Sequence, residues 1–140
     1  MGALPRDWGV PVITPLNEAW FTSGALALQR CASCADVQHP PEEVCRACGA
    51  MDFGVEIVAP SGTVHSFTIV HYAANPALAD AVPYAVVLVS LDDAPHVRII
   101  GNMPETPIDD VRIGLPVVPY WEECAAEDGA IVRLPQWRPA

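Results

Sequence analysis

The stretch that decides the fold holds four cysteines in two pairs, Cys31-Ala32-Ser33-Cys34 and Cys45-Arg46-Ala47-Cys48. Two Cys-x-x-Cys pairs at this separation are the signature of a zinc ribbon. Zn²⁺ takes four ligands in a tetrahedron, so each pair can bind one side of the ion. Because four thiolates leave no open coordination position, we predict a structural site rather than a catalytic one. Iron is an alternative ion, since tetrahedral sulfur suits both metals.

Two other interpretations of the cysteines are disulfide bonds and a redox-active Cys-x-x-Cys pair. We expect neither, because the N-terminal residues do not read as a secretory leader and the chain around Cys31 lacks a thioredoxin-like βαβ pattern. Gly49 follows the second pair, where a residue free to take positive φ is needed. Ala35 holds the equivalent place after the first pair and is a poorer residue for that turn. His39 is interpreted as a surface histidine rather than a further ligand.

The composition favours β structure in a single domain with a small appendage. The chain has 140 residues, of which 51% are hydrophobic, and it contains 15 prolines and 9 glycines. Frequent turn residues indicate short elements rather than long helices.

The charge argues against nucleic acid as a partner. Seven arginines and no lysine stand against 17 acidic residues, for a formal net charge of −10. A nucleic-acid-binding protein needs a basic face to neutralise phosphates. No apolar run approaches the length of a membrane span, so we expect a soluble, cytoplasmic protein without a membrane partner.

The N-terminal region, residues 1–30, is predicted to hold an irregular arm over 1–13 and a short helix over 16–23. Thr14 is the expected N-cap with Pro15 at the first helical position, and Gly24 is the expected end. Bulky apolar groups lie on both faces of this helix. It must therefore pack either on its own fold or on a partner subunit, because isolated two-turn helices are unstable.

The zinc ribbon is assigned to residues 31–50 and a β-barrel to residues 51–140. Alternating or continuous apolar patterns predict strands separated by turns, at 25–30, 53–58, 63–71, 84–91, 97–100, 115–123 and, briefly, 131–134. Short strands at this spacing suggest a five-stranded oligonucleotide/oligosaccharide-binding (OB) barrel. The predicted fold class is thus mainly β, with a helix and a four-cysteine ribbon before the barrel.

The order of these features resembles the zinc-ribbon/OB-fold proteins that accompany thiolase-like, lipid-transfer-protein-type enzymes. The resemblance spans residues 16–138. It rests on Trp20-Phe21, Gly24-x-Leu26-x-Leu28-Gln29-Arg30-Cys31-x-x-Cys34, Pro40-Pro41, Cys45-x-x-Cys48-Gly49, Gly62-Thr63-Val64-x-Ser66-Phe67-Thr68, Pro83-Tyr84 and Val111-Arg112-Ile113-Gly114-x-Pro116-Val117. The chain departs from the family pattern at Ala35, Glu42 and Arg46, but it keeps all four cysteines.

The resemblance implies a protein that is not a catalyst alone. Members assemble with thiolase-fold subunits, sometimes also with a hot-dog-fold hydratase, and these complexes process acyl-CoA thioesters. Examples are retro-aldol cleavage of steroid side chains and acyl transfer. The helix and ribbon commonly lie against the enzyme, and the barrel is expected to help hold the CoA end of the substrate.

The candidate CoA-binding residues are arginines, which suit phosphates, and one tryptophan, whose ring could stack on adenine. They are Arg98, Arg112, Arg138 and Trp137, with Arg133 as a further candidate. No catalytic residue is predicted. Cys124 is a poor nucleophile because the neighbouring Glu122 and Glu123 raise its pKa.

Three functions remain open at this point. The leading one is an accessory subunit of an acyl-CoA aldolase, thiolase or acyltransferase that stabilises the enzyme or positions acyl-CoA thioesters. The alternative is a stand-alone acyl-CoA-binding module. The least favoured is a nucleic-acid-binding OB protein.

Overall fold

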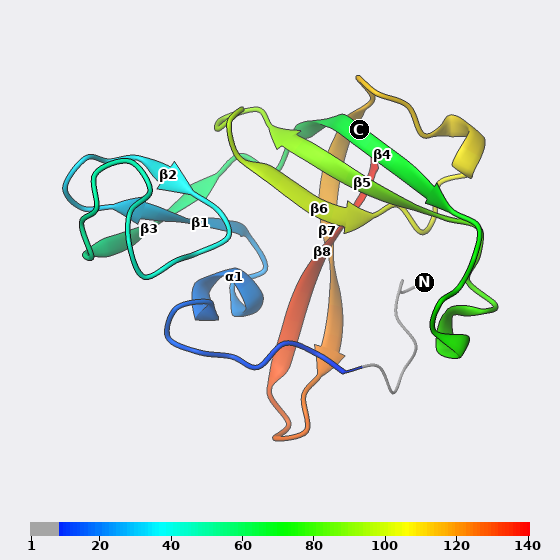
Figure 1. The fold of residues 1–140 in the computed structure, drawn as a ribbon, viewed down its shortest axis with the longest axis horizontal. Coiled ribbons are helices and arrows are strands. Elements are labelled where there is room, and N and C mark those ends of the chain that lie inside the picture. Colours follow the sequence, from blue (N-terminus) through cyan, green and yellow to red (C-terminus); the bar gives the residue numbers. More distant parts are fainter. Residues whose placement is uncertain (1–8) are drawn as a thin grey trace.

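The computed structural model describes residues 9–140 and places two β-sheets side by side (Figure 1). The smaller sheet has three strands in the order β2-β1-β3, and the larger has five in the order β6-β5-β4-β7-β8. All neighbouring strands are antiparallel. The elements of the N-terminal part are α1 (Glu18–Thr22), β1 (Leu26–Cys31), β2 (Val37–Gln38) and β3 (Phe53–Val58).

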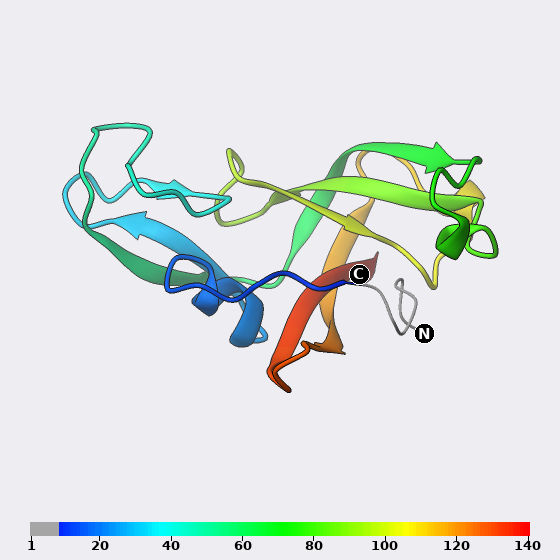
Figure 2. The ribbon, with the colours of Figure 1, turned by 60° about the horizontal axis from the view of Figure 1, so that its bottom comes forward.

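The five-stranded sheet curls into the predicted OB-type barrel. Figure 2 shows the hairpin of its last two strands crossing away from the strands at the other end of the sheet. The elements of this part are β4 (Gly62–Val70), η1 (Pro76–Leu78), β5 (Tyr84–Leu91), β6 (Arg98–Asn102), η2 (Ile108–Asp110), β7 (Pro116–Ala125) and β8 (Ile131–Pro139).

Strand β3 belongs to the sheet of the ribbon. The sequence assigned residues 53–58 to the barrel, but β3 pairs along its whole length with β1, from Leu26 opposite Val58 to Cys31 opposite Phe53. The ribbon sheet therefore reaches Val58, and only residues 59–61 separate β3 from the first barrel strand. The metal-binding loops and the barrel are joined by this short link.

Helix α1 is shorter than predicted and begins differently. The first helical residue is Glu18 and the N-cap is Asn17 rather than Thr14. The Thr14 carbonyl accepts hydrogen bonds from the backbone N–H groups of Asn17 and Glu18, so residues 14–17 form a turn before the helix. Gly24 has a positive φ of 65° and follows the helix as predicted.

Contacts with the rest of the fold hold the short helix α1 in place. Trp20 is buried, and Phe21 packs against the core from a half-buried position. The helix contacts β1 and β8, and Arg133 Nη1 donates a hydrogen bond of 2.8 Å to the Thr22 carbonyl. The helix therefore packs on its own fold. Of the predicted arm over residues 1–13, residues 1–8 lie outside the described residues.

Strand β8 is much longer than the brief pairing predicted at 131–134. It pairs with β7 from Ile131 to Pro139. Its Trp137 is fully buried, and a Cβ at Gly101 on β6 would lie 2.8 Å from the indole Cδ1. A glycine at 101 is therefore what lets this ring enter the barrel. Within residues 9–140, no helix has the length and apolar character needed to cross a membrane.

Candidate metal centre

Two similar turns bring the four cysteines together. Cys31 ends β1, and its carbonyl accepts a 3.0 Å hydrogen bond from Ala35 N–H; the Cys45 carbonyl accepts one of 2.9 Å from Gly49 N–H. Ala35 and Gly49 both have positive φ, 63° and 78°. The predicted equivalence of these two positions is confirmed, and Ala35 takes the left-handed conformation despite its Cβ.

The geometry of the four sulfurs fits a tetrahedral metal ion. All four Sγ atoms lie within 4.8 Å of one another, with 3.6 Å between Cys31 and Cys48 and 3.7 Å between Cys34 and Cys45. Thiolates about 2.3 Å from a tetrahedral zinc ion lie roughly 3.8 Å apart. All four cysteines are free thiols, so the disulfide interpretation is not realised. Four sulfurs would fill all four positions of a tetrahedral ion, as in structural sites.

The thiols differ in how readily they lose their protons. The backbone N–H of Cys34 acts most strongly on Cys31 and lowers the pKa of its thiol to about 7. For Cys34 the largest single influence is the backbone N–H of Asp36, which lowers the pKa, but desolvation and the three neighbouring thiols outweigh it and raise the pKa to about 12. Metal binding must therefore displace protons from this cluster.

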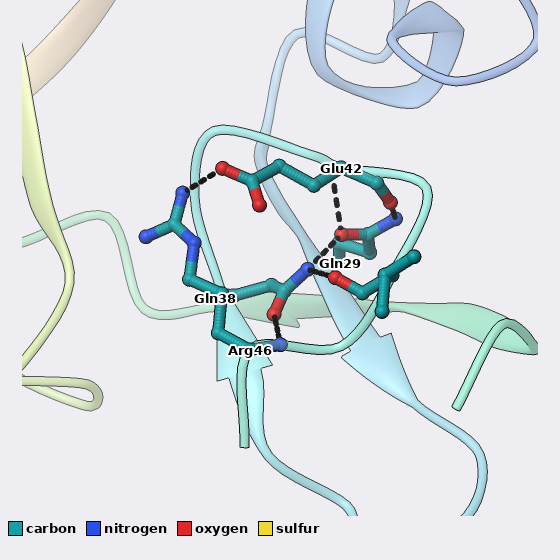
Figure 3. A network of polar contacts seen from close by, with 5 residues as sticks. Gln29, Gln38, Glu42 and Arg46 are labelled. Carbon is teal, nitrogen blue, oxygen red and sulfur yellow. Dashed lines mark hydrogen bonds and ion pairs between the residues drawn. The ribbon is translucent and has the colours of Figure 1, made fainter. Parts of the chain in front are cut away.

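A buried pair of glutamines holds the loop that carries the second cysteine pair (Figure 3). Gln29 on β1 faces Gln38 on β2, and Gln38 Nε2 donates to Gln29 Oε1 at 2.7 Å. The two amides also bond the backbone of the loop: Gln29 binds both N–H and C=O of Glu42, and Gln38 accepts from Arg46 N–H at 3.0 Å. The loop is thus hydrogen-bonded to the ribbon sheet at both Glu42 and Arg46.

Sequence reasoning gave these glutamines no role. Gln29 appeared only as part of a motif, and Gln38 was not singled out. The available signal was one glutamine in each of two short segments that flank the first cysteine pair. That signal has meaning only once β2 is known to pair with β1.

His39 is not the surface residue that the sequence suggested. Its ring lies 4.2 Å from that of Trp20, centroid to centroid, and is half-buried. Burial, with a smaller effect of the Arg46 charge, lowers the pKa of His39 to about 4, so the ring is neutral near pH 7. It is not one of the four residues of the metal cluster.

The predicted CoA-binding arginines lie on three separate elements. Arg98 begins β6, Arg112 follows η2, and Arg138 is near the end of β8; all three are exposed. Arg112 Nη1 donates to the Asp110 carbonyl at 3.4 Å, and the Arg138 guanidinium lies 5.9 Å from the centre of the Tyr120 ring. Their role with phosphates stays a prediction.

Trp137 and Arg133 were considered for CoA binding and Cys124 for catalysis. The structure gives each of them a different environment from the one that such a role needs. Trp137 is fully buried, so its ring has no open face on which adenine could stack. Arg133 pairs with Glu123 at 3.2 Å and with the end of α1. Burial raises the pKa of Cys124, and Glu122 adds to the effect, so the predicted direction holds although desolvation is the larger cause.

Both parts of the chain match known protein families. Residues 22–53 match the family "ChsH2, rubredoxin-like zinc ribbon domain", and residues 56–122 match "ChsH2, C-terminal OB-fold domain". These two ranges meet at β3, the strand that leads from the ribbon into the barrel.

Individual proteins agree with this assignment. A Thermomonospora curvata protein named "Probable enoyl-CoA hydratase alpha subunit" is 35% identical over 133 residues, which are 93% of this chain but only 39% of that protein. The chain thus spans about two fifths of that relative. A "DUF35 domain-containing scaffold protein" of Methanocaldococcus jannaschii is 27% identical over 113 residues, covering 79% of this chain and 78% of the relative.

A solved structure is similar over nearly its whole length. It is a chain of the "Ltp2-ChsH2(DUF35) aldolase", with a TM-score of 0.77 and 34% sequence identity, covering 93% of this chain and 98% of that one. With its four-cysteine ribbon and OB barrel in the same order, the chain belongs to the ChsH2 (DUF35) family of zinc-ribbon and OB-fold proteins.

Proposed function

We propose that the protein is an accessory subunit, not catalytic alone, that binds a thiolase-like enzyme and stabilises it or positions its acyl-CoA thioesters. The enzyme would be an acyl-CoA aldolase, thiolase or acyltransferase. The similar solved structure carries the name of an aldolase complex, and one relative is named a scaffold protein. The hydratase name of the longer relative supports a hot-dog-fold hydratase as a second partner.

The observation that carries this proposal is an apolar surface on the ribbon. We call it the ribbon face: Leu16, Met51, Val55 and Ile57. Val55 and Ile57 are 57% and 59% exposed, and Met51 is 74% exposed. Leu16, Met51 and Val55 border one groove between the segment that precedes α1 and the segment that leads into β3. Grouped apolar side chains at a free sheet edge are typical of a protein–protein contact.

The metal site has a supporting role in this proposal. A saturated centre of four cysteines has no position for substrate, so its contribution is to fix the loops that hold the ribbon sheet in shape. The ribbon face depends on that sheet, because Val55 and Ile57 pair with Gln29 and Ala27 on β1, the strand that ends at Cys31.

The test is co-expression with a thiolase-like, lipid-transfer-protein-type enzyme, followed by size-exclusion chromatography of the zinc-loaded chain. We expect one co-eluting complex. Val55→Asp and Ile57→Asp place charge in the ribbon face and should abolish co-elution. Ile113→Asp is the matched control, because Ile113 is 68% exposed on the barrel and lies outside the ribbon face. No complex with the unchanged chain, or equal loss in the control, would refute the proposal.

A stand-alone acyl-CoA-binding module is the second candidate, favoured by a large cavity in the barrel. Calorimetry on the isolated chain separates the two functions when it is read with the chromatography. Affinity for acyl-CoA without any complex favours the stand-alone module. A nucleic-acid-binding role is opposed by the net charge of −10.

A further inference from the structure

The barrel has an open seam between its two end strands. β6 and β8 stand at opposite ends of the five-stranded sheet, and no ladder between them is present in the described residues. One side chain bridges the seam instead: Gln136 Oε1 accepts a 3.0 Å hydrogen bond from Asn102 N–H. Gln136 is held in turn by Glu122 Oε2 at 2.9 Å from its Nε2.

A cavity of about 740 Å³ lies at this seam. β6 and β8 both contribute to its lining, as do α1 and the segments that follow η1 and β6. Sites for small molecules commonly occupy about 300–1,000 Å³ and are mostly apolar with a few polar groups. The volume of the cavity lies within this range.

The lining is mostly hydrocarbon. Leu78, Ile99, Met103, Ile108 and Leu134 contribute side chains from four parts of the chain. Trp20 and Phe21 add aromatic surface from α1. Such a wall stabilises an apolar group by removing it from water.

The charges around the cavity disfavour an anion. Asp80 lines it, and no arginine among the described residues does. His39 also lines it but is neutral near pH 7, since burial lowers its pKa to about 4. A phosphate or carboxylate inside would meet a like charge and no cation.

We infer that the seam cavity binds the hydrocarbon part of an acyl thioester, a chain or fused ring, while the CoA phosphates stay outside. The identity of the ligand as an acyl group rests on the proposed function. The arginines of the barrel are predicted to bind the CoA phosphates. The seam cavity, in contrast, holds the apolar end of the ligand.

The test is isothermal titration calorimetry of the isolated, zinc-loaded chain with acetyl-, hexanoyl- and dodecanoyl-CoA below their micelle concentrations. Affinity should rise with acyl length, by up to about fourfold for each methylene that enters the cavity. Trp20 lines the cavity, so its fluorescence should change with the longer esters. Affinity that does not depend on acyl length, or no affinity at all, would overturn the inference.

Two variants locate the binding. Leu78→Asp places a charge in the wall and Ala81→Trp fills space, and both residues line the cavity. Each should weaken dodecanoyl-CoA about tenfold or more and leave acetyl-CoA unchanged. Ala77→Asp is the matched control, because Ala77 is exposed next to Leu78 and is not part of the lining. Dodecanoyl-CoA affinity unchanged in both variants would overturn the inference.

Failure here is distinct from failure of the proposed function. A chain that co-elutes with its enzyme but binds no acyl ester contradicts only the cavity. If Leu78→Asp and Ala81→Trp abolish co-elution while no ester binds, the cavity belongs to the protein interface and the inference is wrong. A chain that binds esters by length but forms no complex contradicts only the accessory role.

Discussion

Ala35 adopts a backbone conformation that its side chain opposes. It has a φ of 63° in the turn that follows the first cysteine pair, where the second pair has Gly49 at 78°. The left-handed conformation costs a residue with a Cβ about 1–2 kcal/mol, whereas glycine adopts it freely. The ribbon therefore carries strain at one of its two metal-binding turns and not at the other.

Replacing Ala35 with glycine should stabilise the ribbon. Relief of the left-handed cost exceeds the added chain entropy of glycine, so the free energy of unfolding should rise by about 0.5–1 kcal/mol. Guanidinium unfolding of the zinc-loaded chain measures the change. Gly49→Ala is the matched control and should lower the unfolding free energy by about 1 kcal/mol. A destabilised Ala35→Gly variant would show that the turn carries no strain.

The buried glutamines make a second prediction for single residues. Gln38→Leu removes the hydrogen-bond partners of Arg46 N–H and the Val44 carbonyl, and one of the two donors to Gln29 Oε1. Leaving buried polar groups unpaired should cost roughly 2–3 kcal/mol of unfolding free energy and weaken zinc binding. Arg46→Ala is the control: it breaks only the solvent-exposed ion pair with Glu42, so a much smaller loss of unfolding free energy is expected. Equal losses in the two variants would contradict the role of the buried amides.

At the scale of elements, the contact between α1 and the loop at His39 should make stability depend on pH. The folded pKa of His39 is about 4, against an ordinary value of 6.5. The unfolded chain therefore binds a proton first as pH falls. The contribution of His39 is complete above pH 6.5 and is lost as pH falls from 6.5 toward 4.

The measurement is the difference in unfolding free energy between the natural chain and His39→Phe at several pH values. The variant keeps an aromatic ring beside Trp20 but cannot be protonated. Its advantage over the natural chain should grow by about 2–3 kcal/mol between roughly pH 7 and pH 4. Taking the difference removes the protonation of the cysteines, which affects both chains. A constant difference would mean that His39 is exposed in solution.

Most single elements were predictable because their signals are local. The cysteine spacing identified the metal ligands, and apolar patterns found β1, β3, β4 and β5 to within a residue or two. The features that the sequence does not reveal depend on which strands pair with each other. Nothing in residues 53–58 says which sheet β3 joins, and the two-residue β2 exists only because β1 lies beside it.

Strand β8 shows a different limit of sequence reading. The strand contains Pro135 and Pro139, and proline cannot donate a hydrogen bond to a ladder. β8 is an end strand of its sheet, where proline is tolerated, so the strand continues to Pro139. The length of β8 in turn brings Gln136 to the seam and Trp137 into the core, neither of which local patterns could indicate.

At the scale of the whole molecule, the metal should hold the ribbon, and with it the ribbon face, in the shape that binds the enzyme. Cys45→Ser removes one ligand of the cluster. We expect zinc content to fall from about one ion per chain toward zero, and enzyme binding to be lost with it. Metal analysis and co-elution of the same preparation measure both. Cys124→Ser is the control and should change neither. Enzyme binding that survives complete metal loss would contradict this role of the metal.

The hydrogen bond from Arg133 to Thr22 has a consequence for how the protein is made. The bonded residues are 111 positions apart, and α1 contacts β1 and β8. Synthesis delivers the helix early and β8 more than a hundred residues later. The ribbon is built from contiguous residues and can close on its metal while the barrel strands are still being translated. Helix α1 can therefore contact β1 early, but its contact with β8 and the hydrogen bond from Arg133 can form only after the ribosome has delivered the last strand.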